Sequence, residues 1–429
     1  MLGWLLLGLL FGLGAAANRK DFTGYKVIRV PIANEEQAKI LQDLSRLEVD
    51  FWTLPTTTTP AELLTPPGVF KNVSGILQTL KLPFTVEIDN LEESIVEERE
   101  ANNYAKRQHT SFFRSGAGDF EGIHSYYGTF EQIQDWLRRV ASTYSSIASL
   151  ESIGRTHEGR DLTVLKLSNG GSNKRVIWID GGIHAREWIA PSTTLYTAWK
   201  LISGYQSGET RAFLDKFDWY FLPVVNPDGY VHTHDMNRMW RKNRRPNNHR
   251  DCYGVDPNRN FGFHWAERGT MSSSDPCSEI YHGPYAASEY EPYFMQQALQ
   301  KFKGRLQVYL SFHCYAQMWF VPYGYTWQAA PDHDESLRVA NLARDAVYAV
   351  NKKWYQTGTP SELMYAAGGG SYDYAKGVVG AKYAFTIELR PTQQESRNGF
   401  ILHPSYIRPT GDEIWAGVRK MVEVMRLIY

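Results

Sequence analysis

The stretch RVIWIDGGIHAREWIAP, residues 175–191, decides the fold class of this chain. Residues 175–180 form an apolar run that ends at Asp180, and the glycine pair after it allows a tight turn. His184 and Glu187 follow, ahead of Pro191, which suits the first turn of a helix. The stretch therefore predicts a strand, a turn and a helix, with ionisable side chains gathered in the turn.

Similar apolar runs recur along the chain. They lie at residues 162–167, 219–226, 307–313 and 383–389, and helical patterns lie between them at 129–144, 193–204 and 334–350. Continuous apolar strands between helices indicate a sheet that is covered on both faces. We therefore expect an α/β domain over the larger, C-terminal part of the chain.

Polar groups close three of these runs: Asp180 with His184, Asn226 and His313. In open α/β sheets, ligands bind in the crevice outside the carboxyl ends of the strands. We expect these polar side chains to meet there.

Length and charge limit the choice of function. The chain has 429 residues, which favours two domains. Its 46 basic and 46 acidic side chains give no net charge, so neither a nucleic acid nor an anionic membrane is an expected partner.

The N-terminus is typical of a secretory signal peptide. Residues 1–17, MLGWLLLGLLFGLGAAA, consist of an apolar core followed by small residues at a cleavage site. No basic residue precedes the core, and a transmembrane anchor is the alternative, but the run is shorter than the ~20 residues that a span needs. We expect a secreted protein with no membrane association.

A small α/β unit precedes the main domain. Alternating segments at residues 25–30 and 84–88, a short apolar segment at 49–52 and helical spacing at 34–47 and 72–82 predict it. Prolines at 55, 60, 66 and 67 indicate a long loop in its middle.

The next segment, residues 91–108, is charged almost throughout and predicts a solvated connector helix. Lys106, Arg107 and Arg114 then lie beside small, flexible residues, the kind of exposed segment that proteases cut. An uncut linker is the alternative.

The three cysteines are expected to differ in role. Cys252 and Cys277 flank a polar loop and are predicted to bridge in a secreted chain. Cys314 lies in an apolar segment, which favours a buried packing thiol over a reactive one.

His184 and Glu187 have the H-x-x-E spacing of a metal site, although His264/Glu267 and His232/Asp235 share the spacing in polar, loop-like stretches. A catalytic zinc takes three nitrogen or oxygen ligands from protein and keeps one position open. His184, Glu187 and His313 would supply such a set. The alternative is a hydrogen-bonded core histidine at 313 and a surface ion pair at 187.

Six blocks extend this pattern along the chain. In order they are GIHAREWIA (182–190), NRMWRKNR (237–244), GVDPNRNF (254–261), LSFHCYAQ (310–317), MYAAGGGSYDY (364–374) and FTIELR (385–390). Together they resemble the signatures of the zinc metallocarboxypeptidases of the A/B group, over nearly all of the chain after residue 120. The resemblance implies an α/β/α sandwich with a mixed central sheet, and the small α/β unit before it resembles the family's inhibitory pro-domain.

The resemblance also implies roles for individual residues. One Zn²⁺ per catalytic domain would be held by His184, Glu187 and His313, and Asp256 would orient His184, a role compatible with capping its own turn. The substrate-binding residues that the resemblance implies are Arg186, Asn258, Arg259, Tyr315, Tyr365, Tyr372 and Phe400.

The implied catalytic residues are Glu388 and Arg241. Zinc would acidify a water molecule and polarise the scissile carbonyl, Glu388 would act as the general base, and Arg241 would stabilise the oxyanion. From the residues alone, an ion pair between Glu388 and Arg390 is the alternative, and Arg241 is one more charge in a basic run.

In the family, the residue between the serine and the aspartate of GGS-x-D selects the side chain that is released, and here it is Tyr372. A phenol carries no charge at neutral pH, and Phe320, Gly324, Ala367 and Thr386 nearby are neutral too. Neutral apolar or aromatic C-terminal residues are therefore expected. The aromatic ring of Tyr372 departs from the family pattern. It could shorten the pocket, or it could stack on an aromatic C-terminal residue of the substrate.

The hypothesis is a secreted zinc-dependent exopeptidase made as a zymogen. It has a signal peptide at 1–17, an activation pro-domain and connector at 18–115 and a catalytic domain at 116–429. A protease cutting near Arg107 or Arg114 would activate it, and the sequon at Asn72 would lie in the pro-domain. Two alternatives are a peptide binder of the same fold without activity and a member of the superfamily's regulatory branch, which lacks such a pro-domain.

Overall fold

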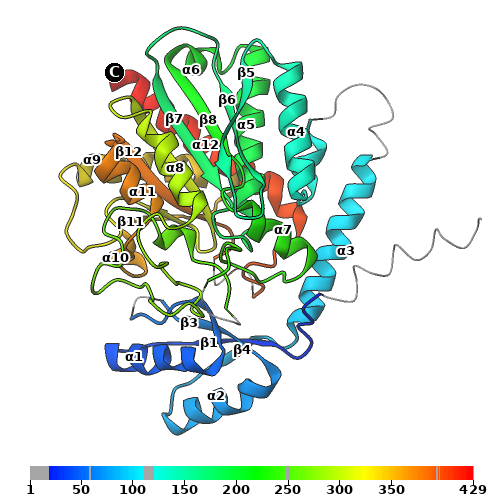
Figure 1. Cartoon of the computed structure of the whole chain (residues 1–429), viewed down its shortest axis with the longest axis vertical. Helices are drawn as coiled ribbons and strands as arrows, with labels where there is room; N and C mark the ends of the chain where they lie inside the picture. Colours follow the sequence, from blue (N-terminus) through cyan, green and yellow to red (C-terminus); the bar gives the residue numbers. More distant parts are fainter. Residues whose placement is uncertain are drawn as a thin grey trace, which may run out of the picture.

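A computed structural model describes residues 19–57, 59–110, 120–247, 252–392, 395 and 397–428. The described chain forms two β-sheets of different size, a small one near the N-terminus and a large one after it (Figure 1). The proposed signal peptide, residues 111–119 with Arg114, and residues 248–251 lie outside the described residues.

The small sheet is antiparallel, with the strand order β2-β3-β1-β4. Its strands are β1 (Lys26–Val30), β2 (Asp50–Thr53), β3 (Ala61–Thr65) and β4 (Thr85–Ile88). Helices α1 (Glu35–Asp43) and α2 (Pro67–Thr79) cover one face, where Ile28, Leu63 and Leu77 belong to a buried apolar cluster. The prediction of one long loop around the prolines was wrong in part, because β3 lies within that segment and pairs with β2 and β1 inside the sheet. Every residue of β3 is buried, since its other face meets the larger unit.

Helix α3 (Leu91–Thr110) connects the two units and lies along the large one (Figure 1). The predicted helix is confirmed, but it is not solvated all round. Leu91, Ile95 and Glu98 are buried, and the two apolar side chains join the main hydrophobic core.

The large sheet has the strand order β11-β10-β12-β9-β7-β8-β6-β5 and is mixed. Its four central strands, β12, β9, β7 and β8, are mutually parallel, whereas β6, β5 and β10 pair antiparallel with their inner neighbours. The strands are β5 (Ala148–Arg155), β6 (Asp161–Leu167), β7 (Arg175–Gly181), β8 (Phe217–Leu222), β9 (Leu306–Cys314), β10 (Met318–Phe320), β11 (Gln356–Gly358) and β12 (Tyr383–Leu389).

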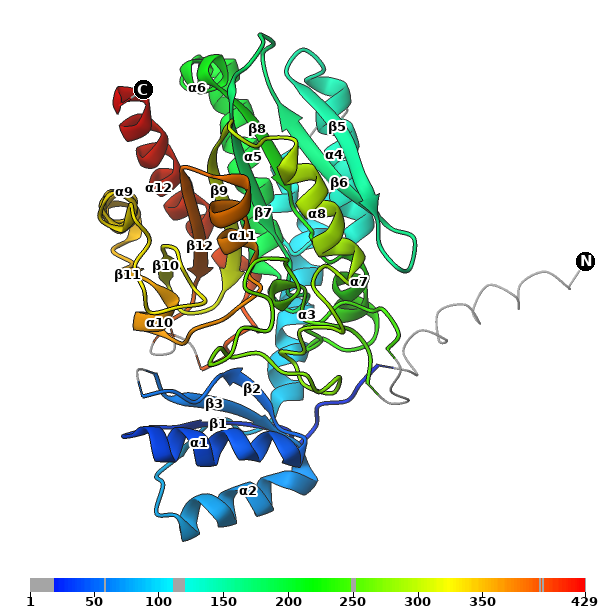
Figure 2. The same ribbon diagram turned by 60° about the vertical axis from the view of Figure 1, so that its left-hand side comes forward.

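Helices cover both faces of this sheet, which confirms the α/β/α sandwich (Figures 1 and 2). On β7, Ile177 and Ile179 face one core and Val176 and Trp178 face the other. Because successive side chains of a strand alternate between faces, a strand buried on both sides reads as a continuous apolar run. The covering helices include α4 (Phe130–Thr143), α5 (Ile189–Ser207), α9 (His333–Asn351) and α12 (Ile407–Ile428) on one face and α8 (Tyr290–Gln300) on the other.

The turn after β7 has the geometry that its glycines predicted. Gly182 has a φ of +66°, and a Cβ there would lie 2.9 Å from the ring of Pro191, in the first turn of α5. A side chain at this position would therefore meet both strain and a clash.

Two further sequence expectations concern cysteines and membranes. Cys252 and Cys277 form a disulfide, and Cys314 is buried and unpaired, as predicted. Within the part of the chain that the structure describes, no helix combines the length and apolar character needed to span a membrane.

Candidate metal centre and cleft

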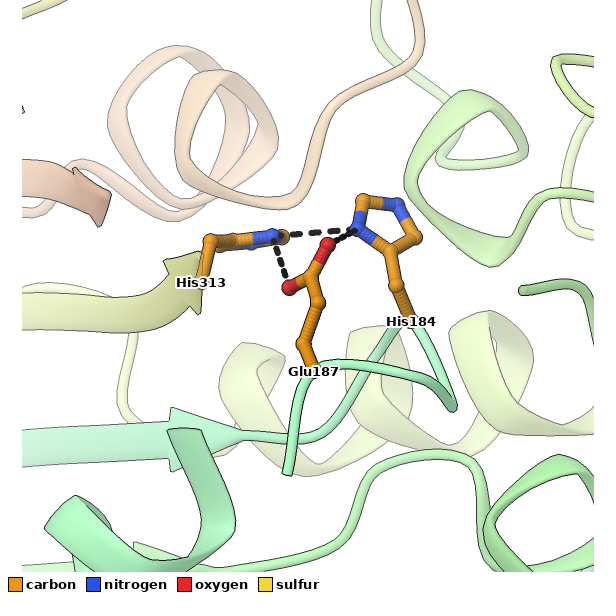
Figure 3. A group of neighbouring side chains, drawn as sticks. All are labelled: His184, Glu187 and His313. Carbon is orange, nitrogen blue, oxygen red and sulfur yellow. Dashed lines mark hydrogen bonds and ion pairs between the residues drawn. The ribbon is translucent and has the colours of Figure 1, made fainter. Parts of the chain in front are cut away.

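Three predicted metal ligands converge at the carboxyl ends of the central strands (Figure 3). His184 and Glu187 lie in the turn after β7, and His313 is near the end of β9. Glu187 Oε1 lies 2.7 Å from His184 Nδ1, Glu187 Oε2 lies 3.3 Å from His313 Nδ1, and the two Nδ1 atoms are 3.2 Å apart. All three side chains are buried, which excludes a surface ion pair at Glu187.

This donor set fits a zinc ion. Two imidazole nitrogens and a carboxylate, with ligand atoms within 4.8 Å of one another, are a ligand combination of catalytic zinc sites. Two ring nitrogens directed at each other repel unless a proton or a cation lies between them. Among the described residues, no other group of His, Cys, Asp and Glu side chains is arranged in this way.

The far nitrogen of each histidine has its own partner. His184 Nε2 lies 3.1 Å from Asp256 Oδ1, and His313 Nε2 lies 3.1 Å from Ser311 Oγ. Ser311 in turn donates to Asp180 Oδ1 at 2.7 Å. Such contacts fix the tautomer and ring orientation of a ligating histidine. Sequence reasoning found Asp256 but missed Ser311, whose signal was its i−2 position on the same strand face as His313.

Glu388 on β12 is paired in register with His313 on the neighbouring strand β9. Its Oε2 atom is buried and has no hydrogen-bond partner in the described part of the chain. Burial raises the pKa of Glu388 to about 7, against the opposing effect of His313. The alternative pairing with Arg390 is wrong, because Arg390 donates to the Glu413 carboxylate, including an Nε–Oε2 contact of 2.9 Å.

Two arginines line the cleft together with Glu388. Arg241 Nη2 donates to Asp256 Oδ2 at 2.8 Å, and its Nε has no partner among the described residues. Arg259 donates from Nε to Met271 O at 2.8 Å, and its guanidinium lies 5.9 Å from the centre of the Tyr365 ring. Both guanidinium groups are therefore held in place by groups of the same unit.

One cleft contains nearly all of the predicted site residues. Arg186 is the exception: it does not line the cleft, and its guanidinium lies 4.3 Å from the centre of the Phe400 ring. The predicted site residues in the cleft wall are His184, Glu187, Arg241, Asn258, Arg259, His313, Tyr315, Tyr365, Tyr372, Glu388 and Phe400, and the expected neighbours Phe320, Gly324, Ala367 and Thr386 accompany them.

Tyr372 lies against Gly324 in the wall of this cleft. A Cβ built on Gly324 would lie 2.2 Å from the Tyr372 hydroxyl oxygen, so the hydroxyl rests directly against the Gly324 backbone. The hydroxyl is buried without a hydrogen-bond partner in the described chain. The neighbouring Asp373 accepts from the backbone N–H groups of Gly324 and Tyr325, and burial raises its pKa to about 7.

Other polar residues that the sequence singled out have structural roles. Asn226 does not join the cleft: its Nδ2 donates to Ile183 O and Lys242 O, and its Oδ1 caps α7 (Pro227–Asp235). The prediction that Asn226 meets His184 and His313 was wrong, because its amide group is hydrogen-bonded to backbone carbonyls instead. The His264/Glu267 pair, 2.8 Å apart, is partly exposed.

The small unit meets the mouth of the cleft through three side chains that sequence reasoning did not find. Trp52 lines the cleft, with its ring 5.3 Å from that of Phe400. Asp50 pairs with Arg186, and Glu62 accepts from the Tyr315 hydroxyl. Figure 2 shows the small sheet below the large unit, on the side where β9 and β12 end. Nothing in the short segment 50–53 or the proline-flanked 61–65 signalled these contacts.

Comparisons with known proteins agree with this geometry. Residues 133–417 match the family model for zinc carboxypeptidase, and residues 28–98 match the model for the carboxypeptidase activation peptide. Carboxypeptidase A1 of Bos taurus is 37% identical over 430 residues, covering 99% of this chain and 98% of that protein. Carboxypeptidase B of Astacus astacus is 41% identical, covering 71% of this chain and 98% of its own length.

A solved structure is similar over both units. Carboxypeptidase A from Helicoverpa armigera superposes with a TM-score of 0.84 at 27% identity, covering 94% of this chain and 97% of that one. The chain belongs to the zinc carboxypeptidase family and carries the family's activation peptide. It is a metallocarboxypeptidase with zinc as its cofactor.

Proposed function

We propose that this protein is a secreted exopeptidase, made as a zymogen, that removes neutral apolar or aromatic residues from the C-termini of peptides. The observation that carries the proposal is the single cleft in which the His184–Glu187–His313 set, the Glu388 carboxylate and two arginines lie together. An exopeptidase of this kind needs three kinds of group: a metal, a base and a receptor for the terminal carboxylate.

The C-terminal carboxylate of the substrate binds to Arg259 and Asn258. A guanidinium binds a carboxylate through two parallel hydrogen bonds, which a lysine cannot provide. Asn258 Oδ1 accepts from Ser371 N at 2.9 Å, which fixes the orientation of its amide. Tyr365, beside Arg259, closes over the bound terminus.

When bound by His184, Glu187 and His313, zinc supplies a Lewis acid that polarises the scissile carbonyl and lowers the pKa of a water molecule. Glu388 accepts the proton of the attacking water and then delivers a proton to the leaving amine. Arg241 donates to the oxygen that becomes negative in the tetrahedral intermediate, from a position set by Asp256. Arg186, Tyr315 and Phe400 contact the peptide further upstream.

The side chain of the released residue enters the space bounded by Tyr372, Gly324 and Thr386. None of these three, nor Phe320 and Ala367 beside them, carries a charge that could pair with a charged side chain, which supports neutral termini. Relatives named carboxypeptidase A and carboxypeptidase B are similar to this chain to a comparable degree. The proposed preference for neutral C-terminal residues therefore rests on the residues of the pocket and not on overall sequence identity.

The domain boundaries of the proposal are a signal peptide at 1–17, a pro-domain with its connector at 18–115 and a catalytic domain at 116–429. Secretion is supported by the apolar N-terminus and by the Cys252–Cys277 disulfide, since disulfides persist in oxidising compartments. An activating protease cuts near Arg107 or Arg114. Arg107 is exposed in the last turn of α3, which makes it accessible.

The test is a release assay. Trypsin-treated protein is incubated with peptides that differ only in a C-terminal Phe, Leu, Ala, Lys or Glu, and the freed amino acid is measured. We expect release of Phe, Leu or Ala ahead of Lys and Glu, and little release before trypsin treatment. Release of Lys ahead of the neutral residues contradicts the specificity, and no release of any residue with zinc present favours a binder without activity.

A further inference from the structure

Behind the predicted zinc ligand His313, the large sheet holds a chain of hydrogen bonds that ends on a buried carboxylate. His313 Nε2 lies 3.1 Å from Ser311 Oγ, and Ser311 donates to Asp180 Oδ1 at 2.7 Å. Ser311 and Asp180 are fully buried, and neither lines the cleft. The chain of bonds therefore reaches His313 from inside the protein and not from the side that substrate enters.

The register of the central strands builds this chain of bonds. Asp180 on β7 is paired with Ser311 on β9, and Ser311 stands two residues before His313 on the same strand. Because side chains two apart on a strand point to the same face, Ser311 can bond to His313 along its strand and to Asp180 across the strand pair. Trp178, two residues before Asp180 on β7, donates from Nε1 to Asp180 Oδ2 at 2.9 Å. All four side chains are thus positioned by strands of one sheet.

The direction of these hydrogen bonds follows from the atom that His313 turns towards the predicted zinc. Its Nδ1 atom lies 3.2 Å from His184 Nδ1 and 3.3 Å from Glu187 Oε2 (Figure 3). Ligation through Nδ1 needs a free electron pair on that atom, so the ring proton must be on Nε2. Ser311 must then accept from Nε2–H, and its own single proton goes to Asp180. The opposite direction, with Ser311 donating to Nε2, would put the ring proton on Nδ1 and block ligation.

The charge of Asp180 is not balanced in the way that the charge of Asp256 is. Asp256, the carboxylate beside the other predicted histidine ligand, pairs with Arg241 at 2.8 Å and lies 3.9 Å from Arg259. In the described part of the chain, the positive charge that acts on Asp180 comes from His313 and not from a lysine or an arginine. Burial raises the pKa of Asp180 to about 6, so the ionised form still predominates at neutral pH. A buried charge is costly unless it is balanced, and a cation bound to His313 would balance this one.

We infer that Asp180 and Ser311 are positioning residues that set the zinc affinity of the site. Through the Ser311 hydroxyl, Asp180 holds His313 with its proton on Nε2 and adds a negative charge behind the ligand. Contacts of this kind orient ligating histidines, and their loss usually weakens metal binding by about 10- to 100-fold. The inference rests on the ligand set of the proposed function, but not on which C-terminal residue is released.

The experiment measures the zinc affinity of the full chain by competition with a chelator of known affinity, and the thermal unfolding of the metal-free and zinc-loaded protein. Ser311→Ala should weaken zinc binding by about 10- to 100-fold. Its unfolding midpoint should fall further below that of the parent in the zinc-loaded state than in the metal-free state, because bound zinc stabilises the variant less. A purely structural role of Ser311 would lower both midpoints alike and leave the zinc affinity unchanged.

Further variants connect the zinc affinity to the hydroxyl and to the charge. Ser311→Thr keeps the hydroxyl and should bind zinc about as tightly as the parent. Ser336→Ala is the matched control: it removes a buried hydroxyl that has no partner among the described residues, from helix α9, which carries none of the predicted site residues. It should leave the zinc affinity unchanged. If Ser311→Ala does not fold, Asp180→Asn decides, because it keeps the shape of the side chain, removes its charge and should weaken zinc binding too.

His313→Ala separates this inference from the ligand assignment on which it rests. If His313→Ala binds zinc as tightly as the parent, the ligand set of the proposed function has failed, and the inference falls with it. If His313→Ala loses zinc but Ser311→Ala, or Asp180→Asn in its place, binds zinc as tightly as the parent, the ligand set stands and the inference alone is overturned. Equal weakening by Ser311→Ala and Ser336→Ala overturns it as well.

Discussion

Glu388 and His313 face each other on adjacent parallel strands, β12 and β9, in direct register. Side chains in register on neighbouring strands lie on the same face of the sheet. The sheet itself therefore places the proposed base beside a metal ligand, without help from a flexible loop. The first two predictions follow from this relationship.

Replacing Glu388 by Gln should lower kcat by about 10²–10⁴-fold, the usual contribution of a general base. The glutamine side chain has the same shape as the glutamate, and position 388 is not a predicted metal ligand. The variant should therefore still bind one zinc per chain and unfold within a few degrees of the parent. Kinetics with metal analysis and calorimetry measure all three quantities. Near-normal kcat in a folded, zinc-loaded variant would remove Glu388 from the mechanism.

Activity should fall on the acid side of neutrality. Burial raises the pKa of Glu388 to about 7 from its ordinary value of 4.5, and the base must be deprotonated to accept a proton. A bound divalent cation favours the carboxylate form and moves the pKa back down. A profile of kcat/KM against pH should thus show an acid limb with an apparent pKa between 4.5 and 7. A limb centred well above that range would disagree with this assignment.

Removing the phenol of Tyr372 should deepen the pocket. Because its hydroxyl rests against Gly324, Tyr372→Ala should raise release of Phe relative to Ala by about 10-fold or more, in line with the effect of pocket size on specificity. Tyr372→Phe keeps the ring and removes a hydroxyl that has no partner among the described residues, so it should leave the order of termini unchanged. If both variants retain the parent's order, the ring does not limit the pocket.

Glu291 should make the folded protein less stable as pH rises. Burial raises its pKa to about 8 from its ordinary value of 4.5, so the folded state keeps a proton that the unfolded state releases between these values. The contribution of Glu291 to the free energy of unfolding is fully present below pH 4.5 and is lost as the pH rises through about 8. Glu291→Gln cannot ionise and should be more stable than the parent by about 2–4 kcal/mol near the upper end of this window, with little difference below it.

Denaturant unfolding at several pH values measures this difference. Glu289→Gln is the contrasting variant, because Glu289 already accepts from Asn243 and pairs with Arg245. It should destabilise the protein at neutral pH. A parallel pH dependence of the parent and Glu291→Gln would show that Glu291 titrates normally.

The sequence predicted the features that arise from periodicity and spacing. The central strands were recognisable because burial on both faces makes a run such as 176–180 apolar almost throughout. His184, Glu187 and His313 were recognisable because each stands at or just beyond a strand end, where a sheet of this class gathers its ligands.

Features that depend on contacts between distant segments were not predictable. β3 lies between prolines and carries Glu62, and its burial comes from packing against the larger unit. Glu98 looked like one more charge on a solvated helix, yet its partner is Arg238, 140 residues away. For Asn226 the error was the reverse: it was predicted to join the site, but its side chain hydrogen-bonds the backbone of Ile183 and Lys242.

The most direct measurement of the central claim is the metal content and activity of the protease-activated enzyme before and after chelation, alongside His313→Ala. We predict one zinc per chain, loss of both metal and peptide hydrolysis on chelation, recovery of both when zinc is restored, and no recovery in the variant. Full activity of the metal-free enzyme, or of His313→Ala, would contradict the account.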